Sequence, residues 1–205
     1  MDDDFPAAHS MDTVWFAVDE AGHVGIFTTG EDGHVPVHTD QDDGLELMNA
    51  LEGKADDPDE EWKDRATRLG LFYYGYGWGT SAIVDPYQRE ASPPQPIHMD
   101  QLPPALRKRA RKRCLKKMDF AQQAWIQPLE QLECDLSNED EAVAYLCGDG
   151  KTVRPIPGKE DRFAGFCEQV RKENPKAAKK FVFEGPQEKP KKPRRRRRKE
   201  NDDGK

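Results

Sequence analysis

The chain has 205 residues, and its 39 Asp and Glu outnumber its 32 Lys and Arg to give a net charge of −7. No run approaches the roughly 18 to 20 apolar residues that cross a bilayer. The start Met1-Asp2-Asp3-Asp4 is opposite in charge to a secretory leader. These features argue against a membrane or exported protein and predict a cytoplasmic location.

The charge is divided unevenly along the chain. Residues 1–100 hold 22 acidic and 5 basic side chains, a net charge of −17, whereas residues 101–205 hold 17 and 27, a net charge of +10. Such an imbalance bears on solubility and on the choice of partners rather than on the fold.

The first half of the chain predicts a hairpin followed by two short helices. Residues 12–18 and 23–28 are rich in strand formers and are separated by a short polar turn. Residues 42–52 place Leu45, Met48 and Leu51 on one helical face, and acidic residues occupy the first turn of a second helix over 58–69. Residues 71–84 follow as an apolar, glycine-rich segment.

The second half predicts a basic helix, further strands and a last amphipathic helix. Two prolines stand at the start of the helix expected over 102–118. Strands are expected over 120–126, 142–147 and 152–156, the last two joined by a tight Asp149-Gly150 turn. Apolar residues at i, i+3, i+4 and i+7 predict a helix over 159–172.

These elements predict a single α+β domain with a mainly antiparallel sheet and several short helices. We place it at residues 11–183, after a flexible acidic N-terminus at 1–10. Residues 184–205 alternate proline with charge and lose their hydrophobic residues, so they are expected to form a disordered basic tail.

Several blocks of the sequence resemble a group of bacterial cytoplasmic proteins without an assigned activity. The blocks are WFAVDEAGHVGIFTTGEDG, HMDQLPPALR, FAQQAWIQPLE and YLCGDGKTVRPIPGKED, and the resemblance covers about residues 12–170. It implies a bacterial cytoplasmic origin and a shared fold, and it transfers no site residue. The tail lies outside the resembling region.

The strongest candidate for binding is the cationic tail, whose side chains can displace counterions from a polyphosphate. Its nine cations are Lys189, Lys191, Lys192, Arg194, Arg195, Arg196, Arg197, Arg198 and Lys199. A solubility tail, or an arm that docks on the acidic half of the same chain, are the alternatives.

A second basic element lies at 107–117, which holds eight Lys and Arg and no acid. On a helix, five of its cations share one side, which we take as a second nucleic-acid contact; they are Lys108, Arg109, Lys112, Arg113 and Lys116. A solvated surface helix that pairs with the acidic helices is the alternative.

Aromatic residues alternate with glycine in residues 71–79. If this segment is extended, Tyr74, Tyr76 and Trp78 lie on one face, where they would either pack in the core or form a platform for a ligand or base.

No motif predicts a catalytic, metal or cofactor site. His34 and His38 lie in an acidic loop without a recognisable ligand pattern, and no Cys-x-x-Cys pair exists. Gly-x-Ser-x-Gly is absent, and among the cysteines only Cys114 has the cationic neighbours that could activate a thiol.

The sequence therefore favours a non-enzymatic binding or regulatory protein that contacts nucleic acid nonspecifically through its basic arm. One alternative is an immunity- or antitoxin-like module whose acidic half blocks a basic protein. The other is an enzyme without a recognisable motif.

Overall fold

The computed structural model describes residues 13–30, 33–40, 43–53, 60–77, 82–136 and 141–185. The expected acidic N-terminus and residues 186–205 of the expected basic tail lie outside these ranges. Glu184, the first residue of the expected tail, is instead held to the smaller sheet, since its amide donates to the Val153 backbone oxygen at 3.0 Å and its carboxylate pairs with Arg154. No helix in the described ranges is long and apolar enough to cross a membrane.

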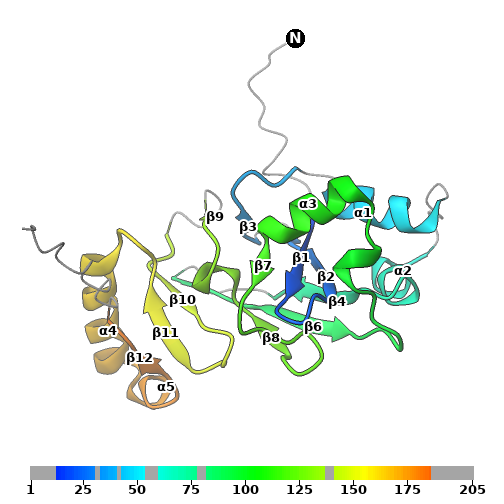
Figure 1. The fold of residues 1–205 in the computed structure, drawn as a ribbon. Helices are drawn as coiled ribbons and strands as arrows, with labels where there is room; N and C mark the ends of the chain where they lie inside the picture. Colours follow the sequence, from blue (N-terminus) through cyan, green and yellow to red (C-terminus); the bar gives the residue numbers. More distant parts are fainter. Residues whose placement is uncertain are drawn as a thin grey trace, which may run out of the picture.

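Two sheets divide the described chain into two lobes (Figure 1). The strands are β1 (Val14–Asp19), β2 (Val24–Thr28), β3 (Val35–Pro36), β4 (Phe72–Tyr76), β5 (Ile83–Val84), β6 (Tyr87–Ala91), β7 (Cys114–Leu115), β8 (Trp125–Ile126), β9 (Cys134–Asp135), β10 (Ala144–Leu146), β11 (Thr152–Pro155) and β12 (Val182–Phe183). The helices are α1 (Asp43–Glu52), α2 (Trp62–Arg68), α3 (Pro104–Lys112), α4 (Glu160–Glu173) and α5 (Pro175–Ala178), with short 3-10 turns η2 (Met99–Gln101) and η3 (Pro128–Glu130).

The larger sheet has the order β7-β1-β2-β4-β6-β8, and the smaller has the order β12-β11-β10-β5. Both sheets mix parallel and antiparallel pairs: β1 and β2 form an antiparallel hairpin, whereas β2 and β4 are parallel. Strands β3 and β9 form a separate antiparallel pair. This arrangement confirms the predicted α+β class.

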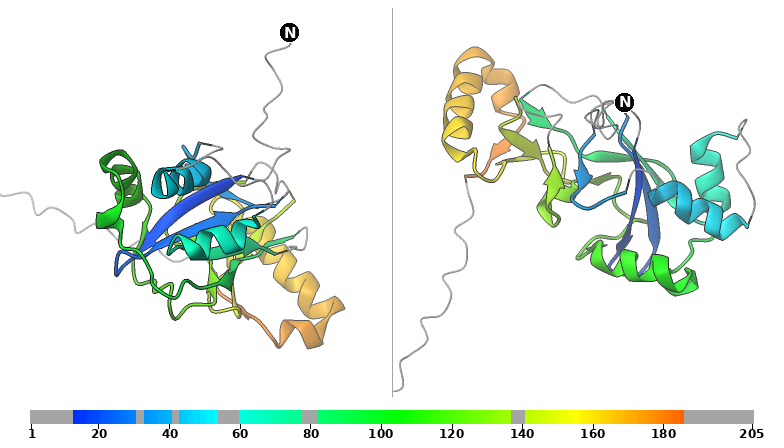
Figure 2. Two further views of the ribbon diagram at one scale, coloured as in Figure 1. Left: turned by 90° about the vertical axis from the view of Figure 1, so that its right-hand side faces the viewer. Right: turned by 90° about the horizontal axis from the view of Figure 1, so that it is seen from above.

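The β1–β2 hairpin of the larger sheet is covered on both faces, and β1 accordingly has no exposed residue. Phe16 and Val18 face the helices, where Leu47 of α1 and Leu106 of α3 join the same core cluster. Figure 2 shows α1, α2 and α3 around this sheet, with the second lobe to one side. The alternation along β1 therefore sorts its side chains between two cores.

The opposite face of the larger sheet carries a layer of aromatic rings. Trp15 stacks on Phe27 at 4.2 Å between ring centroids, and Phe27 stacks on Tyr74 at 4.9 Å. The Trp15 indole donates to the Tyr87 hydroxyl at 3.2 Å, which donates to the backbone oxygen of His34 at 2.5 Å. The buried Trp15 indole and Tyr87 hydroxyl thus both have a hydrogen-bond partner.

The smaller lobe packs α4 on β10 and β11. Phe163 and Cys167 of α4 are buried against Val143 and Val153 in one cluster. Gly150 adopts a φ of +67°, and the Asp149 carboxylate accepts hydrogen bonds from the next turn residues, so the expected hairpin is confirmed.

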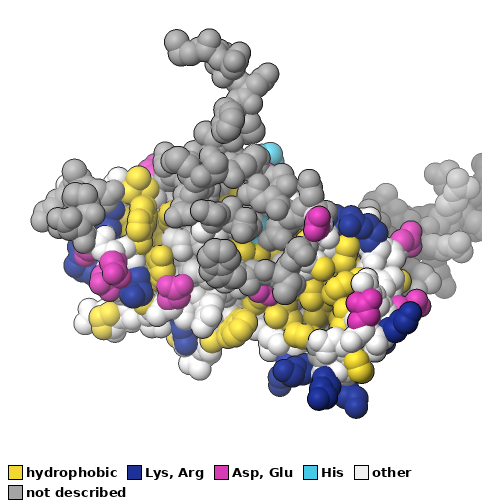
Figure 3. Space-filling view, turned by 180° about the vertical axis from the view of Figure 1, so that it is seen from behind, with side chains coloured by type: hydrophobic (Ala, Val, Ile, Leu, Met, Phe, Trp, Pro, Cys, Tyr) yellow, Lys and Arg dark blue, Asp and Glu magenta, His cyan; other side chains and the backbone are white. Residues whose placement is uncertain are grey.

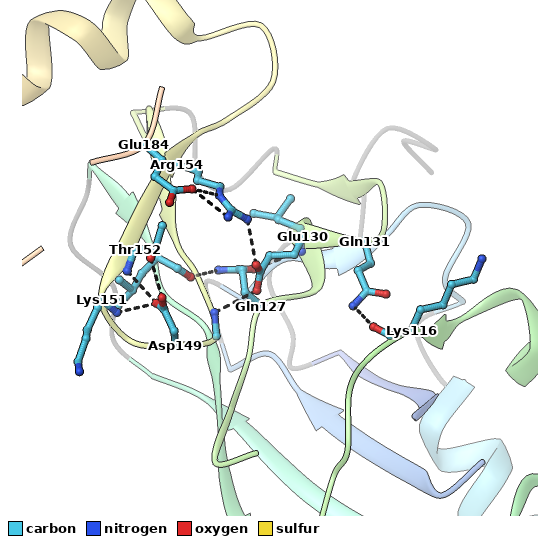
Figure 4. Close-up of polar contacts among 12 residues, drawn as sticks. Lys116, Gln127, Glu130, Gln131, Asp149, Lys151, Thr152, Arg154 and Glu184 are labelled. Atoms are coloured by element: carbon cyan, nitrogen blue, oxygen red, sulfur yellow. Dashed lines mark hydrogen bonds and ion pairs between the residues drawn. The ribbon is translucent and has the colours of Figure 1, made fainter. Parts of the chain in front are cut away.

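Polar contacts join the two lobes (Figure 4). The fully buried Gln127 amide donates to the backbone oxygens of Val84 at 3.3 Å and Leu146 at 3.0 Å. Glu130 accepts from Gly148 at 3.1 Å and from Arg154 at 3.2 Å. Because Gln127 and Glu130 follow the edge strand of the larger sheet directly, these bonds tie the smaller sheet to it.

Most predicted elements are confirmed, with two corrections. The basic helix ends at Lys112 instead of residue 118, because Cys114 and Leu115 leave the helix and pair with the edge of β1. The strand expected over 120–126 is reduced to Trp125–Ile126, since the residues before it form a turn in which the Asp119 oxygen accepts hydrogen bonds.

His34 is a buried histidine whose ring nitrogens are not hydrogen-bonded. Its side chain is buried against Tyr76 and Tyr87, and neither ring nitrogen has a hydrogen-bond partner among the described residues. Burial lowers the pKa of His34 to about 3, which the neighbouring Gln127 side chain offsets only in part. The unfolded chain therefore binds one more proton than the folded chain between about pH 3 and 6.5.

The first prediction concerns His34→Phe and the pH dependence of folding. The free energy of unfolding is highest above pH 6.5 and falls as the pH decreases, because His34 then becomes protonated only in the unfolded state. Between pH 7 and pH 5 this effect of His34 lowers the free energy of unfolding by about 2 kcal/mol. Urea unfolding at the two pH values should show a drop that is smaller by this amount in His34→Phe. The exposed His38 provides the control: His38→Asn should keep the full drop, and an unchanged drop in His34→Phe would contradict the assignment.

Candidate functional site

The helix α3 lies on the larger sheet with its cationic side outward. Pro104 occupies its first turn, and Leu106 and Ala110 are buried toward the sheet. The helix ends where the Arg113 backbone oxygen accepts from the Val18 amide of β1 at 3.2 Å. The sheet edge thus sets both the length of α3 and the direction of its side chains.

A buried carboxylate receives Arg109 of this helix and Arg113, which directly follows it. Asp43, the first residue of α1, has no exposed surface, and its two oxygens accept hydrogen bonds from Arg109 and Arg113. Arg109 also reaches Glu46 at 2.6 Å. The Arg113 guanidinium lies over the Phe16 ring, 5.5 Å from its centroid, which adds a cation–π contact.

A cavity of about 440 Å³ opens beside these arginines. It is lined by Pro36, Val37, His38, Arg109, Lys112, Arg113, Leu132 and Glu133. Its volume lies within the range of ordinary small-molecule sites, which combine apolar walls with a few charged groups. Three of its side chains are cations, but Arg109 and Arg113 are already paired with Asp43, so Lys112 is the lining cation that has no acidic partner among the described residues.

Part of the cavity wall comes from residues that carried no sequence signal. Strands β3 and β9 have only two residues each, and their pairing brings Pro36 next to Leu132 and Glu133. Because a two-residue strand has no detectable period, the sequence does not predict this pairing.

Other cations on α3 and on the segment after it have no acidic partner among the described residues. Five exposed side chains of α3 and the segment after it form no ion pair with a described residue: Lys108, Arg111, Lys112, Lys116 and Lys117. We call this set the α3 cationic surface. Its charge is open to solvent and to a partner.

The structure places the predicted binding residues in three groups. The tail residues Lys189 to Lys199 lie outside the described ranges. Lys108 and Lys112 are exposed on α3, and Lys116 is exposed beyond β7 rather than on the helix. Arg109 and Arg113 turn inward to Asp43, as the alternative of pairing with an acidic helix anticipated.

The proposed aromatic platform is not assembled as a surface. Tyr74 is fully buried, its hydroxyl donates to the backbone oxygen of Gln123 at 3.1 Å, and burial raises its pKa. It therefore cannot offer its ring to a ligand. Tyr76 is half-buried against the same core, and Trp78 lies outside the described ranges.

Many carboxylates of the acidic half are used within the fold. Glu52 of α1 pairs with Arg65 at 3.0 Å and with Arg68 of α2, and Glu60 pairs with Arg68 at 2.6 Å. The hydrogen bond from Arg68 lowers the pKa of Glu52. These acids hold α1 to α2 and leave less uncompensated charge for a basic partner.

The buried thiols are poor nucleophiles. Burial raises the pKa of Cys134 to about 12 and that of Cys147 to about 12, and it also raises the pKa of Cys167. A thiol needs its thiolate form to attack. Cys114, the thiol with the most cationic sequence neighbours, is half-buried and faces the Asp19 backbone oxygen at 3.8 Å.

Comparison with known proteins finds no matching family model, no matching curated protein and no matching solved structure. The resemblance to bacterial cytoplasmic proteins therefore stays a prediction.

The second prediction concerns Asp43→Asn. The substitution keeps the side-chain volume but leaves the buried Arg113 without a counter-charge, so it should lower the free energy of unfolding by about 3 to 5 kcal/mol. Glu46→Gln removes the exposed partner of the same Arg109 and should cost at most about 1 kcal/mol. Urea unfolding of both variants checks this; equal losses would show that the buried pair has no special role.

Proposed function

We propose that this protein is a non-enzymatic binding protein that holds single-stranded nucleic acid nonspecifically on the α3 cationic surface and its tail. The observation that carries the proposal is the α3 cationic surface, whose Lys112 also lines the cavity of about 440 Å³ beside α3. Phosphates attract such a surface regardless of base sequence.

The chemistry of the cavity supports a nucleotide unit as its occupant. Lys112 provides a donor and an unpaired positive charge for a phosphate, while Val37 and Leu132 give apolar walls for a base or sugar.

The tail supports the same function by adding charge without adding specificity. Its nine cations would each release counterions, and the resulting affinity would fall steeply with salt. The alternative, a module that blocks a basic protein with its acidic half, has less support because the Glu52, Glu60 and Asp43 carboxylates are neutralised inside the fold.

A second cationic patch offers a matched control. Seen from behind, Lys and Arg side chains gather at α5 in the smaller lobe (Figure 3). Lys176 of α5 and the following Lys179 and Lys180 are exposed and do not line the cavity.

The third prediction compares charge variants of the full chain. Fluorescence anisotropy with a labelled single-stranded oligonucleotide, measured over a series of salt concentrations, gives the slope of log K against log salt. Replacing Lys108, Arg111 and Lys112 by Ala should reduce this slope by about 2, and replacing the five arginines 194–198 by Gln should reduce it by about 3.5, from about 0.7 per lost contact.

The control replaces Lys176, Lys179 and Lys180 by Ala, which removes the same number of charges. Its slope should stay close to that of the unaltered chain. Equal slopes for both triple variants would remove α3 from the site, and an unaltered slope after the arginine replacement would remove the tail. Capture of a basic protein that survives both changes would favour the acidic-module alternative.

A further inference from the structure

Three metal-ligating side chains converge at the end of the β1–β2 hairpin. Asp19 ends β1, His23 stands just before β2, and Asp119 lies in the turn after β7. Each residue offers one ligand atom, and these atoms all lie within 4.8 Å of one another. The His23 Nδ1 and Asp19 Oδ2 atoms are 3.1 Å apart. Atoms that share one zinc ion tetrahedrally with bonds of about 2.0 to 2.2 Å lie about 3.3 to 3.6 Å apart, so the three ligand atoms need only small side-chain movements to reach that spacing.

The charge of Asp19 gives an independent reason to expect a cation here. Its side chain is fully buried, and among the described residues only His23 lies within ion-pair distance of it. Asp43 is equally buried but has two arginines. A buried carboxylate needs a counter-charge or a metal ion, and no Lys or Arg of the described chain supplies one to Asp19.

The two carboxylates are held in place by backbone amides. Asp19 accepts from the His23 amide at 2.8 Å and from the Phe120 amide at 2.9 Å. Asp119 accepts from the Ala121 amide at 2.8 Å. An ionised carboxylate has about four lone-pair sites, so each keeps acceptor capacity for a metal. Such outer hydrogen bonds orient the ligands of natural metal sites.

The hairpin turn is closed tightly enough to keep the ligands together. Gly22 has a φ of +87°, and a Cβ at this position would lie 2.1 Å from Nε2 of His98. His98 packs against the turn as the bridge partner of His23. The turn thus requires glycine, and the ring of His98 lies beside the turn but outside the ligand cluster.

We propose that Asp19, His23 and Asp119 form a zinc site. Two carboxylate oxygens and one imidazole nitrogen are ligands that Zn²⁺ accepts, and three protein ligands leave a fourth position for water. His23 is partly buried and Asp119 is exposed, which gives the ion a path from solvent. On binding, His23 Nδ1 gives up its hydrogen bond to Asp19 and coordinates the ion as neutral imidazole. This proposal is independent of nucleic-acid binding.

The fourth prediction is tested by titrating Zn²⁺ into the chelator-treated full chain by calorimetry, with urea unfolding in parallel. We expect one ion per chain and a Zn²⁺-dependent rise in the unfolding midpoint. His23→Gln and Asp119→Asn should each weaken binding at least about tenfold. Asp119 is exposed, so its variant stays interpretable even if His23→Gln folds poorly.

His98→Gln serves as the matched control, because His98 neighbours the site and contacts Asp100 at 3.2 Å but is not a ligand. It should bind Zn²⁺ as tightly as the unaltered chain. Absence of one-to-one binding would overturn the proposal, as would equal affinity in all three variants, since the ion would then be held elsewhere, for example by thiols.

Discussion

The buried carboxylate of Asp43 fixes how the two oppositely charged halves of this chain meet. It accepts hydrogen bonds from Arg109 and Arg113, which lie 66 and 70 positions further along the chain. Removing a carboxylate and two guanidinium groups from water costs several kcal/mol each unless they pair closely. The helices α1 and α3 can therefore cover the larger sheet only in an orientation that brings these three groups together.

That orientation divides the basic residues of α3 into two sets with different roles. The arginines that reach Asp43 set the rotation of the helix, and Leu106 and Ala110 then face the sheet. Lys108, Arg111 and Lys112 are left on the solvent side. The run of basic residues over 107–117 thus includes arginines with a structural role, and only its solvent-exposed cations add salt-dependent attraction to a polyanion.

Local signals explain which parts of the structure could be predicted. The β1–β2 and β10–β11 hairpins and the helix α4 follow from turn residues and apolar periods within a few positions of one another. The end of α3 does not, because Cys114 and Leu115 continue a good helical pattern and are removed from it by pairing with β1. The cavity walls and the pairing of Asp43 with its arginines also do not follow from local signals, since each depends on residues brought together from distant segments.

The two fully buried aspartates show why the charge of this protein is better described by environment than by sequence half. Asp43 lies beneath α3 and is neutralised by arginines, which makes it a structural group. Asp19 lies at a hairpin end with backbone amides and one histidine, a setting that stabilises a negative charge but does not neutralise it. The first arrangement consumes positive charge and the second attracts it. The acidic half thus contributes a structural pair at one point and a candidate cation site at another, so its net charge alone does not identify a partner.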